Sequence, residues 1–374
     1  NSEGWGVRVA SRAQLTETVR WNLSGLYTQS DAANIVNFEC NPARPTQCGD
    51  KRYVTTGLLR NNGGLNQFGT VVLANDKGSL PLGSETRLGL ISSNLQWDLG
   101  WAQLQAITGF VRTEQDYLID FFDGRAAPTI SFGLDPATGR PTRFNVGTNV
   151  NLFPAVRGFR AGGFVIANIA ETDQFTQEVK LQGQALNGAV TWVAGVFYFD
   201  EKSVTDFADT LTGATGAVTL LADRVVRNKT EAIAGYAQAD WDFAPRWKAT
   251  FGVRYTDEKR RTDFSDNRAI CQVTPLPATC IDTRNFASVD VDLNPATPNI
   301  AIPLDQQIRI WTPRFALNYQ VSDDVLVFAS ATRGFKSGAQ AARATLVRQL
   351  LPVGPEKVWS SEIGAQTEWF DRRL

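Results

Sequence analysis

The sequence predicts an all-β protein, an antiparallel β-barrel that spans a membrane. Three observations predict it. Long segments alternate apolar and polar residues, short and long connections follow each other in strict alternation, and tryptophans gather near strand ends, several beside the short connections. The chain has 374 residues, which suits one large all-β unit or two or three soluble domains. No linker between domains is visible, so we expect a single unit.

The alternation is clearest in "RWKATFGVRYTDEK", where Trp247, Phe251 and Tyr255 share one face and Lys248 and Arg254 share the other. A period of two places successive side chains on opposite faces of a strand. The same pattern recurs in segments 175–182, 311–319 and 359–369. Each segment is therefore predicted to be a strand with one apolar and one polar face.

The connections between these strands fall into two classes. Short turns are expected near 15–17, 97–100, 186–189, 243–246, 321–324 and 370–373. Long polar connections are expected at about 31–86, 123–172, 207–228, 262–305 and 338–357. Transmembrane barrels place short turns on the periplasmic side and long loops on the extracellular side, whereas structureless loops this long count against a compact soluble domain.

We expect about 12 strands of roughly 10 to 20 residues, longer than the 9 to 11 that cross the hydrocarbon, so the surplus should rise above the membrane. Pro313 lies inside a strand pattern and has no amide hydrogen for a ladder. It predicts a bulge or an unpaired position. A turn of helix is expected within 338–351.

Composition excludes several classes of function. The net charge of −1 gives no broad basic surface for nucleic acid. The absence of histidine removes His-based zinc sites and catalytic triads, and no glycine-rich phosphate loop precedes a helix. We expect no enzyme activity, no cofactor and no metal site. The charged residues on polar strand faces are predicted to pair across a polar interior: Glu178, Glu362, Glu368, Lys180, Arg254 and Arg314.

The four cysteines form two close pairs, Cys40 with Cys48 and Cys271 with Cys280, each in a polar loop rich in Pro and Asn. Three pairings are open in principle. Two local disulfides are the simplest arrangement and would place the chain outside the cytosol. The alternative is four free thiols.

Five segments together resemble the barrel of the TonB-dependent outer-membrane receptors, especially the iron–siderophore receptors. They are "FTQEVKLQ" (175–182), "WVAGVFYFDEKS" (192–203), "GYAQADWDFAPRWKATFGVRYTDEKR" (235–260), "TPRFALNYQVSDDVLVFASATRGFKSG" (312–338) and "PEKVWSSEIGAQTEWFDRR" (355–373). The resemblance is close from about 173 to 373 and looser before that.

The resemblance implies a fold and a function. Family barrels have about 22 strands around a plugged lumen, so residues 1–374 are expected to form the central part of one barrel domain, without the plug domain and the C-terminal strands. The implied function is energised uptake of a scarce ligand, most often a ferric siderophore, across the outer membrane of a Gram-negative bacterium. The implied partners are TonB with its inner-membrane complex, acting through the plug, the ferric ligand, and outer-membrane lipid.

Two groups of residues are candidates for contacts. The connection at 123–172 mixes positive charge with an aromatic side chain, which suits an anionic ferric chelate; the alternative is a solvated loop. These residues are Arg140, Arg143, Arg157, Phe159 and Arg160. Arg333 and Lys336 stand where a strand leaves the membrane. We expect them to pair with lumenal carboxylates or to hold the plug, with direct ligand contact as the alternative.

Two other functions stay open at this point. A passive, porin-like barrel would lack a plug, and a soluble extracellular β-protein, either a carbohydrate-binding module or a hydrolase, would turn its apolar faces into a packed core. The sequence does not identify the ligand, because one fold serves many substrates.

Overall fold

The structure is a computed structural model that describes residues 2–32, 73–80, 83–120, 163–212, 218–287, 296–344 and 347–369. These residues contain eleven strands, against about 12 expected. The strands are β1 (Ser2–Gln14), β2 (Val19–Ala32), β3 (Gly83–Asp98), β4 (Ala102–Asp120), β5 (Gly163–Ala185), β6 (Val190–Thr212), β7 (Val218–Ala244), β8 (Trp247–Asp266), β9 (Asp305–Ser322), β10 (Val325–Lys336) and β11 (Glu356–Thr367).

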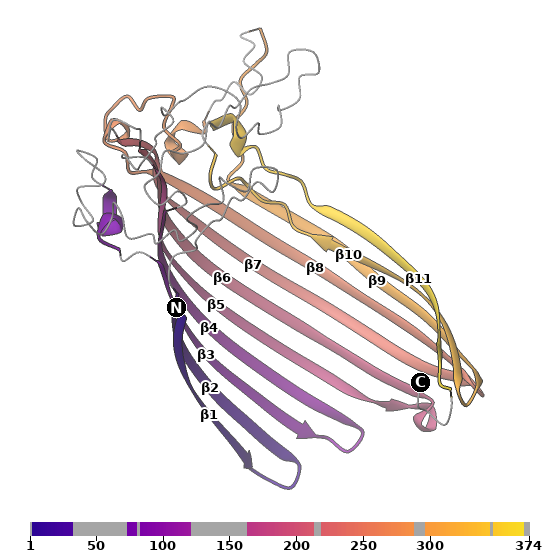
Figure 1. Cartoon of the computed structure of the whole chain (residues 1–374). Helices are drawn as coiled ribbons and strands as arrows, with labels where there is room; N and C mark the ends of the chain where they lie inside the picture. The colour runs from indigo at the N-terminus through magenta and orange to yellow at the C-terminus, as the bar shows by residue number, and fades with distance from the viewer. Residues whose placement is uncertain are drawn as a thin grey trace, which may run out of the picture.

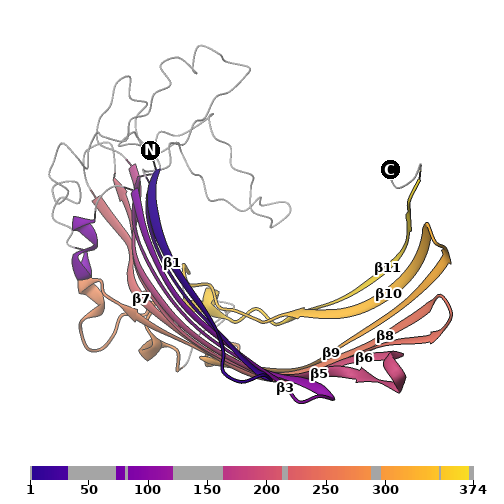
Figure 2. The ribbon, with the colours of Figure 1, turned by 90° about the horizontal axis from the view of Figure 1, so that it is seen from below.

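All eleven strands form one sheet in the order β1 to β11, each antiparallel to the next. The strands lie tilted side by side (Figure 1), and the sheet curves into an open trough with β1 at one rim and β11 at the other (Figure 2). The predicted fold class, part of an antiparallel barrel, is therefore confirmed. Within the described ranges, no helix has the length and apolar content needed to cross a membrane.

Glycines show which face of the trough is concave. A Cβ on Gly109 would lie 2.7 Å from Thr176 Oγ1, and one on Gly195 would lie 2.7 Å from Tyr236 Oη, whereas a Cβ on Gly89 or Gly235 would meet nothing within 4 Å. Side chains converge on the concave side of a curved sheet and spread apart on the convex side. The face that carries Gly109 and Gly195 is therefore the inner face, and the face of Gly89 and Gly235 is the outer face.

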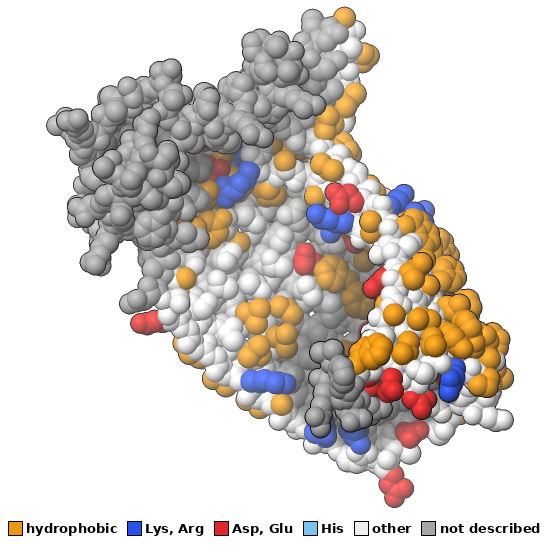
Figure 3. All heavy atoms as spheres, turned by 45° about the vertical axis from the view of Figure 1, so that its right-hand side comes forward, with side chains coloured by type: hydrophobic (Ala, Val, Ile, Leu, Met, Phe, Trp, Pro, Cys, Tyr) orange, Lys and Arg blue, Asp and Glu red, His pale blue; other side chains and the backbone are white. Residues whose placement is uncertain are grey.

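The outer face carries the apolar half of the alternation. The register joins the apolar side chains of neighbouring strands into a band, as with Phe251 opposite Phe315 and Trp247 opposite Tyr319. Many of these side chains are exposed, Ile233 by 61% and Ile363 by 89%, which water would not favour and lipid does. Figure 3 shows hydrophobic side chains gathered along the edge of the sheet at the right of the view.

The apolar band has a defined height. On the outer face of β8 it runs from Trp247 to Tyr255, and charged residues take over from Asp257 onward. Nine residues match the 9 to 11 that a tilted strand needs to cross the hydrocarbon core. The strands continue beyond the band, so their upper ends rise above the membrane, as the sequence predicts.

Short and long connections alternate as predicted, with two corrections. The connection expected at 123–172 ends earlier, because β5 begins at Gly163. Tight turns join β1 to β2, β3 to β4, β5 to β6, β7 to β8 and β9 to β10, all at one end of the sheet. The connection expected at 207–228 is wrong, because β6 continues to Thr212 and β7 begins at Val218. Phe207 and Val226 are buried in a hydrophobic cluster on the inner face, which favours extending these strands.

Pro313 marks the place where β9 and β10 separate. The two strands pair up to Arg314 and Thr332, while β9 stays paired with β8 as far as Asp305 and β10 stays paired with β11 as far as Lys336. Proline has no amide hydrogen to donate to a ladder, so the expected unpaired position is confirmed. We call the gap between 305–313 and 333–336 the seam.

The upper ends of the strands carry short 3-10 turns: η3 (Ala74–Ser79), η5 (Ala269–Cys271), η6 (Thr283–Asn285) and η7 (Val347–Leu350), with η4 (Leu186–Gly188) in a tight turn at the opposite end. η7 confirms the helical turn expected within 338–351. Val347 and Leu350 of η7 belong to the same inner-face cluster as Phe207 and Val226. The β10–β11 connection therefore packs onto the inner wall.

The assignment of the two faces predicts that an arginine has different effects at two positions of β9. Phe315→Arg places a charge in the middle of the apolar band and should lower the free energy of unfolding by about 2 to 4 kcal/mol. Asn318→Arg, on the inner face of the same strand, should change it by less than about 1 kcal/mol. Urea titration of the complete natural protein refolded into lipid vesicles measures both. Equal effects of the two substitutions would contradict the assignment of the faces.

Candidate functional site

The inner face carries a polar cluster at mid-height. The phenol of Tyr236 crosses above Gly195, where any Cβ would collide with it, and donates a hydrogen bond of 2.7 Å to Glu178. The guanidinium of Arg254 lies 5.9 Å from the centre of the Tyr236 ring and 5.3 Å from that of Phe197. The wall thus presents a carboxylate and a cation held by aromatic rings.

This cluster tests the predicted polar face. The register places Glu178, Lys180, Arg254, Arg314 and Glu362 on the inner face, as expected. Their pairing differs from the expectation in part, because Glu178 bonds to a phenol and Arg254 lies over rings. The pattern of alternation indicates the face but carries no signal for Tyr236 as the partner.

A second cluster lies at the upper end of the inner face. Arg343, from the β10–β11 connection, bonds to Asp209 on β6 and donates a bond of 3.4 Å to Tyr117 Oη on β4. Its guanidinium carbon stands 4.5 Å from the centre of the Phe207 ring, and that of Arg224 stands 5.5 Å from it. We call Arg343, Phe207, Asp209, Tyr117 and Arg224 the upper cluster.

The two arginines of the upper cluster have different accessibility. Arg224 is 1% exposed and donates to the carbonyls of Ala344, at 2.7 Å, and Ala342, so it holds the connection in place. The side chain of Arg343 is 40% exposed. A partly exposed guanidinium over an aromatic ring suits a planar, anionic group, through charge-assisted hydrogen bonds and stacking.

The β8–β9 connection is held by a disulfide between Cys271 and Cys280. Asp266 accepts hydrogen bonds from the Ile281 amide, at 2.9 Å, and from Arg268. Asp266 lies close to both sulfurs, but oxidised cysteines offer no thiolate to a metal. In the described part of the chain this group of side chains is therefore structural and not a metal site.

Asp282 caps η6 in the same connection. Burial by itself raises the pKa of Asp282, but the side-chain bond from Arg284, at 2.7 Å, and amide bonds from Arg284 and Asp266 favour the carboxylate more, so its pKa lies below the ordinary value. A carboxylate with a lowered pKa stabilises the fold above the unfolded pKa, and this contribution is lost as the pH falls through the folded value.

On the outer face, η3 is fixed by a buried cation. Lys77 is fully buried, with Nζ 2.5 Å from Asp206 Oδ1 and 3.0 Å from Asp223 Oδ1. The Ala74 amide also donates to Asp223. Leu73 packs beside these contacts with apolar residues of β4, β5 and β6. The β2–β3 connection is therefore anchored outside the trough.

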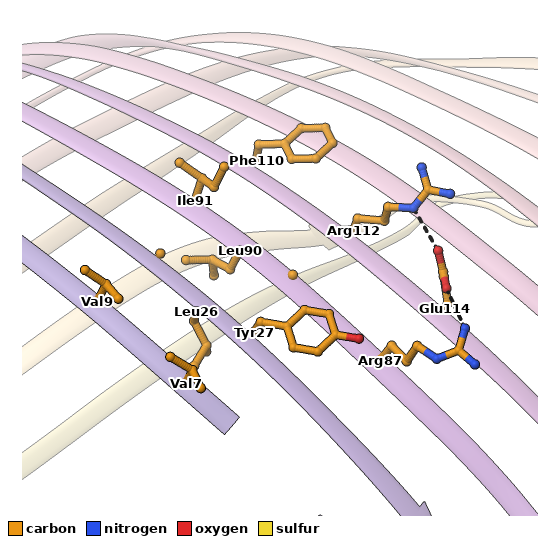
Figure 4. Close-up of a pocket in the computed structure, with 12 residues that line it drawn as sticks. Val7, Val9, Leu26, Tyr27, Arg87, Leu90, Ile91, Phe110, Arg112 and Glu114 are labelled. Atoms are coloured by element: carbon orange, nitrogen blue, oxygen red, sulfur yellow. Dashed lines mark hydrogen bonds and ion pairs between the residues drawn. The ribbon is translucent and has the colours of Figure 1, made fainter. Parts of the chain in front are cut away.

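A hollow of about 760 Å³ lies on the outer face of β1 to β4. It opens over Gly25 and Gly89, between apolar side chains and a charged end. Figure 4 shows Arg87 and Arg112 turned toward the carboxylate of Glu114. Because this hollow faces lipid, we exclude it as the site for a ligand that enters the lumen.

The structure describes only some of the candidate residues predicted from the sequence. Arg140, Arg143, Arg157, Phe159 and Arg160 lie outside the described residues, as do Cys40 and Cys48. Lys336 is exposed and lies on the inner face, opposite Glu356.

Arg333 requires a correction. It lies opposite Trp359, on the outer face, and its guanidinium donates to the carbonyl of Trp311 at 3.5 Å across the seam. The alternation along β10 gives it the same face as Ala329 and Ala331. It therefore does not project toward lumenal carboxylates.

A model of the family described as TonB dependent receptor-like, beta-barrel, matches residues 8–374. The chain belongs to the TonB-dependent receptor family. Its barrel lies in the outer membrane of Gram-negative bacteria, so the apolar band faces lipid and the upper ends of the strands face the exterior. The soluble alternative is thereby excluded. No curated protein sequence matches the chain.

Solved structures share the fold at low identity. The ferric yersiniabactin uptake receptor FyuA from Yersinia pestis has a TM-score of 0.60 and 12% identity, over 98% of this chain and 43% of that one. The ferric-catecholate import receptor Fiu from E. coli K12 has a TM-score of 0.60 and 12% identity, over 100% of this chain and 50% of that one. The siderophore receptor PiuA from Acinetobacter baumannii has a TM-score of 0.56 and 12% identity, over 99% of this chain and 48% of that one. The chain spans about half the length of these proteins.

The Asp282 cap predicts a local effect of pH. Asp282→Asn should raise hydrogen exchange in the β8–β9 connection about tenfold or more at neutral pH, because charge-assisted bonds are lost. Wild type should reach the same state only below about pH 3.9, the unfolded pKa. Exchange of the complete protein followed by mass spectrometry measures this. Asp263→Asn, on the exposed outer face, is the control; if it matched Asp282→Asn, the cap would have no special role.

Proposed function

We propose that the protein is an outer-membrane receptor that takes up a scarce ligand with energy delivered through TonB, and that this ligand is a ferric siderophore. The family membership supports receptor function rather than an enzyme. FyuA, Fiu and PiuA, which share the fold, are named as ferric-chelate or siderophore receptors. Transport belongs to the complete protein, of which this chain supplies wall, lining and connections.

The observation that carries the ligand class is the upper cluster. Arg343 offers a partly exposed guanidinium over Phe207 at the exterior end of the lumen, where an arriving ligand first meets the wall. Ferric chelates are commonly anionic and rich in planar donor groups, which this pair of side chains suits. Arg140, Arg143, Arg157, Phe159 and Arg160 remain proposed ligand contacts, and Lys336 remains our proposed contact with a plug.

Deleting the complete gene tests the proposal. The deletion strain should grow poorly under iron limitation when one ferric chelate of a panel is the sole iron source, and uptake of that chelate labelled with radioactive iron should vanish. Uptake in a strain without TonB should vanish equally. Uptake that persists without TonB would establish the passive channel instead.

The proposed role of the upper cluster predicts that a substitution of Arg343 weakens ligand binding. Arg343→Ala in the complete protein should weaken binding of the ferric ligand about tenfold or more, the loss of one charge-assisted contact. Arg261→Ala, on the outer face of β8, is the matched control and should bind as wild type does. Binding is measured with radioactive iron on intact cells without TonB, so that transport does not contribute. Unchanged binding by Arg343→Ala would remove the cluster from the ligand site.

A further inference from the structure

Asp209 and Arg343 hold each other in the upper cluster. The side chain of Asp209 is 14% exposed and that of Arg343 is 40% exposed, so the guanidinium is the more accessible partner of the pair. A carboxylate is the kind of group that an anionic ligand offers to a guanidinium. When the site is empty, Asp209 therefore takes up the charge of Arg343 that the ligand is proposed to use.

The backbone at Arg343 is fixed without Asp209. Arg224 donates hydrogen bonds to the carbonyls of Ala342 and Ala344, the residues on either side of Arg343. Ala344 is itself buried in the hydrophobic cluster of the inner face. The chain is thus held on both sides of the residue that carries the guanidinium.

The side chain of Arg343 also has contacts that do not involve the carboxylate. Its guanidinium carbon lies 4.5 Å from the centre of the Phe207 ring, and it donates a bond of 3.4 Å to Tyr117 Oη. Because the backbone, the ring and the phenol already place the guanidinium, Asp209 contributes a negative charge to the site more than it contributes geometry.

A second cation stays near Asp209 when Arg343 leaves it. Arg224 is 1% exposed and attracts Asp209 electrostatically. It attracts Asp266 as well, but Asp266 already pairs with Arg268. Arg224 Nε is shielded from solvent and has no hydrogen-bond acceptor among the described residues. A carboxylate beside a cation costs less free energy than one left alone, so the pair with Arg343 can open.

We propose that Asp209 is an internal competitor of the ligand. Its carboxylate pairs with Arg343 while the site is empty, gives way to an anionic group of the ferric chelate, and pairs with Arg343 again as the ligand leaves. This inference rests on the proposed function. The guanidinium keeps an anionic partner before and after each exchange. The competition lowers the affinity and speeds release, which suits a receptor that has to pass its ligand on.

The pairing itself is tested without a ligand. Phenylglyoxal adds across two nitrogens of a guanidinium, so a carboxylate bonded to one of them slows the reaction. In the complete natural protein, purified in mild detergent, Asp209→Asn should raise the rate of modification at Arg343 about fivefold or more, followed by mass spectrometry of peptides. Asparagine keeps the shape of aspartate and loses its charge. Glu201→Gln, which removes a carboxylate from the inner face of the same strand, should change the rate less than about twofold.

The competition is tested with the triply negative complex of iron(III) and three catecholates, labelled with radioactive iron, on cells without TonB. Asp209→Asn should bind this complex about three- to tenfold more tightly than wild type and release it more slowly by a similar factor. In the Arg343→Ala background the same substitution should change the affinity less than about twofold, because the competition needs both partners. Glu201→Gln should bind as wild type does.

Three results would overturn the proposal. They are an unchanged modification rate of Arg343 in Asp209→Asn, weaker binding by Asp209→Asn, which would make Asp209 a positioning residue, and an equal gain in affinity in both backgrounds, which would indicate simple charge repulsion. If wild type binds neither this complex nor any other ferric chelate, the proposed function fails instead, and the modification rates still decide whether Asp209 holds Arg343.

Discussion

The whole structure depends on one constraint: neighbouring strands must stay paired across the membrane while their side chains alternate between lipid and a polar interior. A shift of one residue would exchange the two faces of a strand. Charged residues such as Glu178 and Arg254 would then meet hydrocarbon, and Ile233 would meet water. That penalty fixes the register of every hairpin, and the ladder leaves few backbone groups without a partner in lipid.

The constraint relaxes above the apolar band, where the strands outgrow the membrane. There the connections fold back onto both faces. Phe207, Val226 and Leu350 form a buried cluster on the inner face, and Lys77 is clasped between two aspartates on the outer face. A fully buried ammonium costs free energy unless it is paired and hydrogen-bonded, so the clasp holds the β2–β3 connection in one position.

The same relaxation leaves one irregular site on each side of the wall. On the inner side, Arg343 is placed over Phe207 by contacts with β4 and β6. On the outer side, Pro313 ends one ladder and leaves Arg333 to donate a hydrogen bond to the carbonyl of Trp311. Both depend on a strand or connection that departs from regular pairing, which agrees with the tendency of irregular backbone to carry function.

The sequence by itself determined the all-β fold, the two faces of each strand and the alternation of short and long connections, because a period of two and the content of turn residues are local properties. It also indicated the unpaired position at Pro313. Only the tertiary structure decided that Arg333 donates to Trp311 across the seam, that residues 207–212 and 218–228 extend two strands, and that Arg343 meets Phe207 and Asp209. These outcomes rest on contacts between residues far apart in the chain, 134 positions for Arg343 and Asp209. Such contacts depend on how the connections close, and no local pattern of residue types encodes that.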